Sequence, residues 1–125
     1  MNTLKPLVAA LAMGALVLPL SASAQGQGGS DELTRHLRAC LSAGAGGAPK
    51  DSLLSAVVAL RSLCGVQIKR VRAYRLAEID RHFGLPGAKL TPQRKDELER
   101  AHEAATRALN DEVALAISNF TGLTS

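Results

Sequence analysis

Residues 52–83 constrain the fold more than any other part of the chain. They contain no proline and only one interior glycine, Gly65. Their apolar side chains recur in steps of three and four, at Leu53, Val57, Leu60, Cys64, Ile68 and Val71. Because each residue of an α-helix turns by about 100°, this spacing places all of them on one face. We therefore predict one long amphipathic helix over residues 52–83, with Gly65 as its weakest point and the place where a kink would form.

The first 24 residues have the pattern of a signal peptide. Lys5 supplies a positive charge, residues 7–20 are almost entirely apolar, and Ala22 and Ala24 stand at the two positions that a signal peptidase reads. As a helix the apolar run would be about 20 Å long, short of the ~30 Å hydrocarbon core of a bilayer. We expect cleavage after Ala24, a periplasmic or secreted product, and no permanent membrane anchor after cleavage. The alternative is an uncleaved segment that stays at the membrane interface.

The remainder predicts a single all-α domain over residues 31–121. Residues 25–30 are rich in glycine and glutamine, and we expect them to be disordered after cleavage. Few stretches show the β-branched alternation of a strand. The core must be built from Leu, Val, Ile and Ala, because the only aromatic residues are Tyr74, Phe83 and Phe120.

Two further helices flank the long one. The first is expected at 31–43 and ends where repeated glycines precede a proline, in residues 44–49. The last is expected at 92–120, after Thr91 as a cap and with Pro92 at the first helical position. The predicted architecture is a short N-terminal helix packed on a long antiparallel helical hairpin that turns near Pro86.

The two cysteines, Cys40 and Cys64, both lie on apolar helical faces of a chain with an export signal. In an oxidising compartment this pattern predicts one disulfide between them. That bond would attach the short first helix to the long second one. The alternative is a zinc, copper or redox site formed by both cysteines and His36, which lies one helical turn before Cys40.

Most of the excess positive charge is gathered in one short run of the long helix, at Lys69, Arg70, Arg72 and Arg75. In a hairpin that turns near Pro86, Arg72 and Arg75 would come opposite Glu99 and Glu103, and simple charge pairing would explain them. The second interpretation is a face for an anion or an acidic partner. Nucleic acid is not expected as a partner, since the chain is exported and only Tyr74 offers an aromatic platform within the run.

Three histidines are spread over the predicted helices, and His102 falls on the inner stripe of the last one. We predict a hydrogen-bonded core histidine there rather than a metal ligand. The sequence contains no phosphate-binding loop, zinc-hydrolase helix or nucleophile elbow. The expected function is therefore not enzymatic and needs no cofactor.

The segment Leu90-Thr91-Pro92-Gln93-Arg94 resembles the start of the LTxxQ motif of periplasmic chaperones and stress sensors, with Arg94 where that family has glutamine. The resemblance implies a helical cradle that binds unfolded client proteins or responds to envelope stress. Beside this alternative and the metal or redox site, our main expectation is a small exported protein of binding or structural type. Its partner would be another envelope protein or a second copy of itself.

Overall fold

The computed structural model describes residues 29–125. The predicted signal peptide and cleavage point lie outside these residues, as does most of the predicted disordered segment, of which residues 29 and 30 are helical. The helical core lies within the compact unit Leu33–Ser125.

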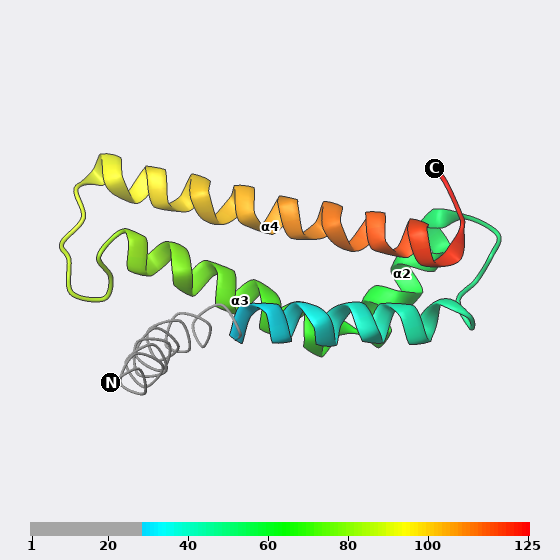
Figure 1. Ribbon diagram of the computed structural model, residues 1–125. Coiled ribbons are helices and arrows are strands. Elements are labelled where there is room, and N and C mark those ends of the chain that lie inside the picture. Colours follow the sequence, from blue (N-terminus) through cyan, green and yellow to red (C-terminus); the bar gives the residue numbers. More distant parts are fainter. Residues whose placement is uncertain (1–28) are drawn as a thin grey trace, which may run out of the picture. The chain divides into compact units, whose positions relative to one another are not determined.

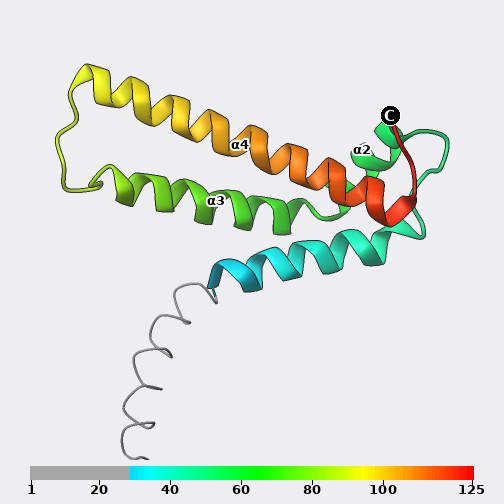
Figure 2. The same ribbon diagram turned by 45° about the horizontal axis from the view of Figure 1, so that its top comes forward.

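The prediction of an all-α fold is confirmed. The described residues form an N-terminal helix (residues 29–45), α2 (Leu53–Leu63), α3 (Gly65–His82) and α4 (Pro92–Thr121), with no strand among them. α3 and α4 lie side by side and antiparallel, joined at one end by residues 83–91 (Figures 1 and 2). α2 packs against α4 near the opposite end of that pair.

The long helix predicted over residues 52–83 is helical almost throughout, but it is divided into α2 and α3, which meet at Cys64 and run in different directions (Figure 1). Cys64 has φ −102° and ψ 22°, outside the helical range. Its N–H still donates to the carbonyl of Leu60 at 2.9 Å, and its own carbonyl accepts from the N–H of Ile68 at 3.0 Å. The chain therefore bends without losing hydrogen bonds, one residue before the predicted kink at Gly65.

The predicted disulfide between Cys40 and Cys64 is present, with the two Cα atoms 5.9 Å apart. Cys64 is fully buried at the bend, so the bond joins the N-terminal helix to the centre of the core. Ala48, in the loop after the N-terminal helix, also belongs to the core. The remaining members come from all four helices: Leu37, Leu41, Ala56, Leu60, Ile68, Val71, Leu109, Val113, Ala116 and Ile117.

The core occupies only part of the molecule. Every fully buried side chain belongs to residues 33–71 or 109–125, which we call the core half. In the arm, which we define as residues 72–108, no described side chain is fully buried. The arm contains the rest of α3, the connecting loop and the first half of α4, so only two helices meet there.

The loop between α3 and α4 is formed by an ordered helix end and a cap. Gly84 has φ 83°, and its N–H donates to the carbonyl of Arg81 while the N–H of Leu85 donates to Asp80, the pattern of a Schellman motif. At the other side, the hydroxyl of Thr91 accepts from the N–H of Arg94, as predicted for a helix cap. The start of α4 extends past the end of α3 (Figures 1 and 2).

Candidate functional site

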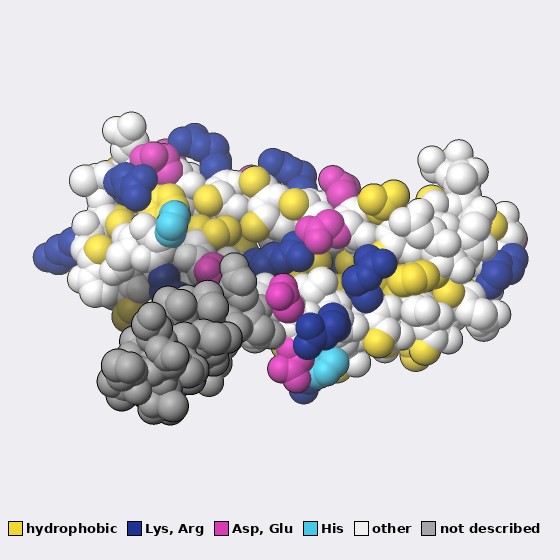
Figure 3. Space-filling model, in the orientation of Figure 1, with side chains coloured by type: hydrophobic (Ala, Val, Ile, Leu, Met, Phe, Trp, Pro, Cys, Tyr) yellow, Lys and Arg dark blue, Asp and Glu magenta, His cyan; other side chains and the backbone are white. Residues whose placement is uncertain are grey.

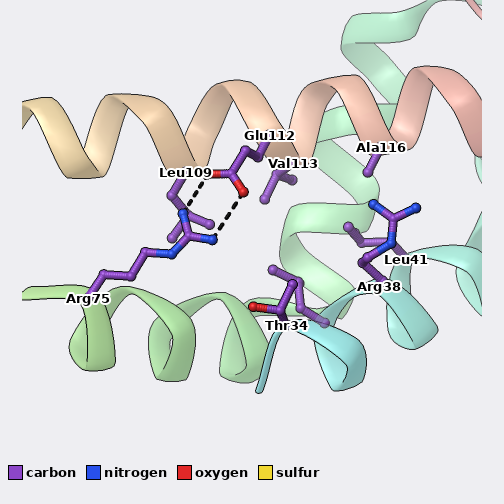
Figure 4. A pocket seen from close by; sticks show the side chains of 9 residues that line it. Thr34, Arg38, Leu41, Arg75, Leu109, Glu112, Val113 and Ala116 are labelled. Atoms are coloured by element: carbon purple, nitrogen blue, oxygen red, sulfur yellow. Dashed lines mark hydrogen bonds and ion pairs between the residues drawn. The ribbon is translucent and has the colours of Figure 1, made fainter. Parts of the chain in front are cut away.

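A crevice opens between the N-terminal helix, α3 and α4 (Figure 4). Arg75 reaches across it from α3 to the carboxylate of Glu112 on α4, with Nη1–Oε2 at 2.5 Å and Nη2–Oε1 at 3.0 Å. The two parallel bonds form a bidentate pair, the strongest geometry for arginine and carboxylate. The guanidinium of Arg38 lies 5.3 Å from the ring centroid of Phe120, at the edge of the same crevice.

The size of this crevice limits what it can hold. Its free volume is about 40 Å³, and each water molecule needs roughly 10–15 Å³ on the same measure. A few water molecules fit, but an organic ligand does not. The crevice is a small gap in the packing between helices, and the ion pair of Arg75 and Glu112 spans it.

The predicted basic face is divided by the structure. Arg75 is engaged by Glu112, whereas Lys69 and Arg70 are exposed and, like the half-buried Arg72, form no ion pair within the described residues. The predicted pairing of Arg72 and Arg75 with Glu99 and Glu103 is wrong. The partner of Arg75 lies nine residues further along α4 than Glu103, because residues 83–91 do not reverse the chain as tightly as a turn near Pro86 would.

His102 is hydrogen-bonded, as predicted, but it does not belong to the core. Its Nε2 lies 2.7 Å from Oδ1 of Asp80, and this contact joins α4 to α3 within the arm. Both side chains are partly exposed, so the pair is not a buried polar site.

The structure uses both cysteine sulfurs in the disulfide, which leaves no thiolate for the alternative site of His36, Cys40 and Cys64 in this form of the protein. Among the described residues, no group of three or more His, Cys, Asp or Glu side chains has the arrangement of a metal site.

The most unusual group of exposed side chains belongs to α2 and the start of α3. Four large apolar side chains are exposed there: Leu54 (71%), Val58 (62%), Leu63 (63%) and Val66 (58%). We call these four residues the α2 face. The described residues contain one more large apolar side chain of comparable exposure, Leu115 of α4. Leu54 and Val58 stand one turn apart, opposite the buried Ala56 and Leu60, whereas Leu63 lies on another flank of α2, beside Gly44, and Val66 begins the exposed side of α3. Exposed apolar residues scattered singly are ordinary, but a group of them is typical of an interaction surface.

The inner side of α2 is apolar as well. Ala56 and Leu60 are buried in the core, and Arg61 is the only charged residue in this helix of 11 residues. A helix that is apolar all round is normally covered on every side. An open, mostly apolar depression of about 540 Å³ continues this surface, between α2, Ala114 of α4 and the last two residues of the chain.

Sequence reasoning missed the α2 face because it searched for one apolar stripe. The stripe that begins at Leu53 does not include Leu54, Val58 or Leu63, so the apolar spacing predicts no role for these residues. The scarcity of charge in residues 53–63 is the observation that would have identified them.

No helix in the described part of the chain is both long enough and apolar enough to cross a membrane. Comparison with known proteins finds no family model, no curated protein and no solved structure that matches this chain.

Proposed function

We propose that this is a small exported helical protein that acts by binding through the α2 face, without a chemical step. The observation that carries the proposal is the exposure of Leu54, Val58 and Leu63 on α2, whose inner side already fills the core, together with that of Val66 at the start of α3. Placing such side chains in water has an unfavourable free energy, of about 25 cal/mol for each Å² of apolar surface. A partner that covers them recovers this free energy.

The other features of the molecule support binding by an outer surface. The crevice at Arg75 has room only for water, and the polar groups of Arg75, Glu112, Asp80 and His102 satisfy one another. A disulfide in the core and the signal-peptide pattern of the first 24 residues support a location in the periplasm or outside the cell.

The test is photo-crosslinking in the native cell envelope. A photoreactive phenylalanine analogue at Val58 should give a specific adduct, because this position lies within the α2 face. The same analogue at Leu115 is a matched control, since that residue is equally exposed but lies on α4. Identical adducts from both positions, or none from either, would contradict the proposal.

A chaperone function, the alternative implied by the LTxxQ resemblance, receives support from the same apolar exposure, which would suit unfolded clients. The resembling residues lie elsewhere, however, at the loop end of the arm (Figure 1). There the guanidinium of Arg94 lies 4.1 Å from the ring centroid of Phe83 and also pairs with Glu97, so this residue helps to fix the start of α4. Suppression of client aggregation that depends on Val58 would favour the chaperone function.

A further inference from the structure

We infer that the α2 face docks on an anionic lipid surface, with α2 lying in the plane of the membrane interface. This inference rests on the proposed function, because it names the partner of the same surface. It is carried by the charges that border the α2 face.

Asp51 borders the start of the α2 face, in the depression beside Leu54, but the charges that follow along the chain are of one sign. Between Asp51 and Glu78 the chain has no acidic residue but five basic ones, at Arg61, Lys69, Arg70, Arg72 and Arg75. Of these, Arg75 is paired with Glu112. On the face of the molecule that Figure 3 shows, positive and negative side chains lie next to one another. A run of residues with exposed apolar groups and unopposed positive charge is complementary to an anionic, partly apolar partner.

Two of the basic residues lie beside Val66, the member of the α2 face that belongs to α3. Val66, Lys69 and Arg70 stand at i, i+3 and i+4 of α3, which places them on one side of this helix, and all three are exposed. Lys69 and Arg70 form no ion pair within the described residues, so binding breaks no existing salt bridge. Their long side chains can lie along apolar surface while their charges reach lipid phosphates.

The dimensions of α2 fit a surface position. Its 11 residues span about 16 Å, roughly half of the hydrocarbon thickness, so this helix is too short to cross a bilayer. Amphipathic helices in the interface bury their apolar side by about 5–10 Å and attract anionic lipids through Lys and Arg. The inner side of α2 stays fixed to the core through Ala56 and Leu60, so docking requires no unfolding.

A second copy of the chain fits this surface less well. In a twofold dimer each residue patch meets the same patch of the partner, so a symmetric contact at Val66 would bring Lys69 and Arg70 towards their own counterparts. Like charges held close together in an interface are unfavourable. An anionic lipid surface provides apolar contact and opposite charge together.

The first experiment places a fluorescent probe in the α2 face. The sequence has no tryptophan, so Val58→Trp gives a single probe and Leu115→Trp gives a control of similar exposure. The protein is expressed from its full coding sequence, purified in the form that the cell produces, and mixed with vesicles of phosphatidylcholine with or without 30% phosphatidylglycerol. We expect a blue shift at Val58→Trp with the anionic vesicles only, and none at Leu115→Trp. The probe reports on its own surroundings, so a contribution from the N-terminal residues does not mimic the result.

The second experiment tests the charges. Each basic residue near an anionic surface changes the affinity about five-fold, so Lys69→Gln with Arg70→Gln should weaken binding to anionic vesicles about 30-fold. It should also flatten the salt dependence. The control is Lys95→Gln with Arg100→Gln, which removes the same charge from exposed positions of α4 and should leave the affinity unchanged. Circular dichroism and thermal melting confirm that both double variants fold.

The outcomes separate this inference from the proposed function. Equal binding to neutral and anionic vesicles, or equal weakening by both double variants, would overturn the lipid inference. So would the absence of any shift at Val58→Trp. If photo-crosslinking from Val58 then captured a protein, the binding function would stand with a protein partner. If neither lipid nor protein contacted Val58, both proposals would fail.

Discussion

The core half and the arm share α3 and α4, yet they are held together by different interactions. In the core half, the N-terminal helix and α2 pack against α3 and α4 and enclose apolar side chains, and a disulfide ties the layers together. In the arm, α3 and α4 meet alone and no described side chain is fully buried. The specific contacts there are polar or cation–π: Asp80 with His102, and Arg94 with Phe83.

The difference shows that the number of helices that meet decides what they can bury. Two helices touch along one line, so their side chains remain open on both flanks, whereas a third and a fourth helix close those flanks. Stability should therefore be uneven. The free energy of local opening should be low in the arm, whereas the core half should open only when the whole domain unfolds. The proposed binding surface lies in the core half, where the backbone is fixed.

The largest expected effect comes from the disulfide, which belongs only to the core half. Reducing the bond between Cys40 and Cys64 should lower the free energy of unfolding by about 3.5 kcal/mol, because the unfolded chain regains the entropy of the loop that the bond closes. Urea denaturation of the oxidised and the reduced protein measures this difference. A change below about 1 kcal/mol would show that the apolar core alone holds the N-terminal helix.

The second prediction compares the same substitution in the two halves of one helix. Leu109→Ala removes a side chain that is 2% exposed in the core half, and should lower the free energy of unfolding by about 3 kcal/mol. Leu98→Ala removes a partly exposed side chain in the arm and should cost about 1 kcal/mol. Hydrogen exchange should show faster opening throughout the molecule for the first variant and in the arm for the second. Equal losses would remove the distinction between the halves.

The features that were predictable from the sequence are those set by local pattern. The periodicity around Cys64 predicts helices, and two cysteines on apolar faces of a chain with an export pattern predict the disulfide. The bend at Cys64 was not located, because the adjacent Gly65 permits a kink without requiring one. The register of α3 against α4 depends on the path of residues 83–91, and periodicity carries no information about that path.

The candidate site was hidden for a different reason. A search for one recurring apolar stripe assigns Leu53 and Leu60 to the core and ignores Leu54 and Val58, which lie outside that stripe and are exposed. Only the packed structure shows that these residues remain exposed after the core is complete. The basic residues were noticed in the sequence, but their division into paired and unpaired members depended on the register.

The third prediction concerns close packing between the N-terminal helix and α2. At Gly44 an added Cβ would lie 2.6 Å from Cδ2 of both Leu60 and Leu63. Leu60 is buried and cannot move freely, so Gly44→Ala should lower the free energy of unfolding by about 1 kcal/mol, after the gain in helix propensity is counted. Gly46→Ala is the control, since nothing lies within 4 Å of its added Cβ, and it should be neutral or slightly stabilising. Thermal denaturation should show a lower melting temperature for Gly44→Ala and an unchanged or slightly higher one for Gly46→Ala.

The same change in melting temperature for both variants would mean that the side chains of Leu60 and Leu63 move aside without cost.

The smallest expected effect lies at the boundary between the halves, where Arg75 bridges to Glu112. Arg75→Gln should lower the free energy of unfolding by about 0.5–1 kcal/mol, because the side chains of this pair are 29% and 54% exposed and solvent screens their attraction. Arg72→Gln changes a neighbouring arginine that has no ion pair within the described residues, and should cost less. Denaturation at low and high salt distinguishes the two, since only the loss at Arg75 should shrink as salt rises. A double-mutant cycle with Glu112→Gln then isolates the pair energy. Two results would contradict this role of the charge pair in fixing the register of α3 against α4. One is a larger loss of unfolding free energy for Arg72→Gln than for Arg75→Gln, and the other is a loss for Arg75→Gln that does not change with salt.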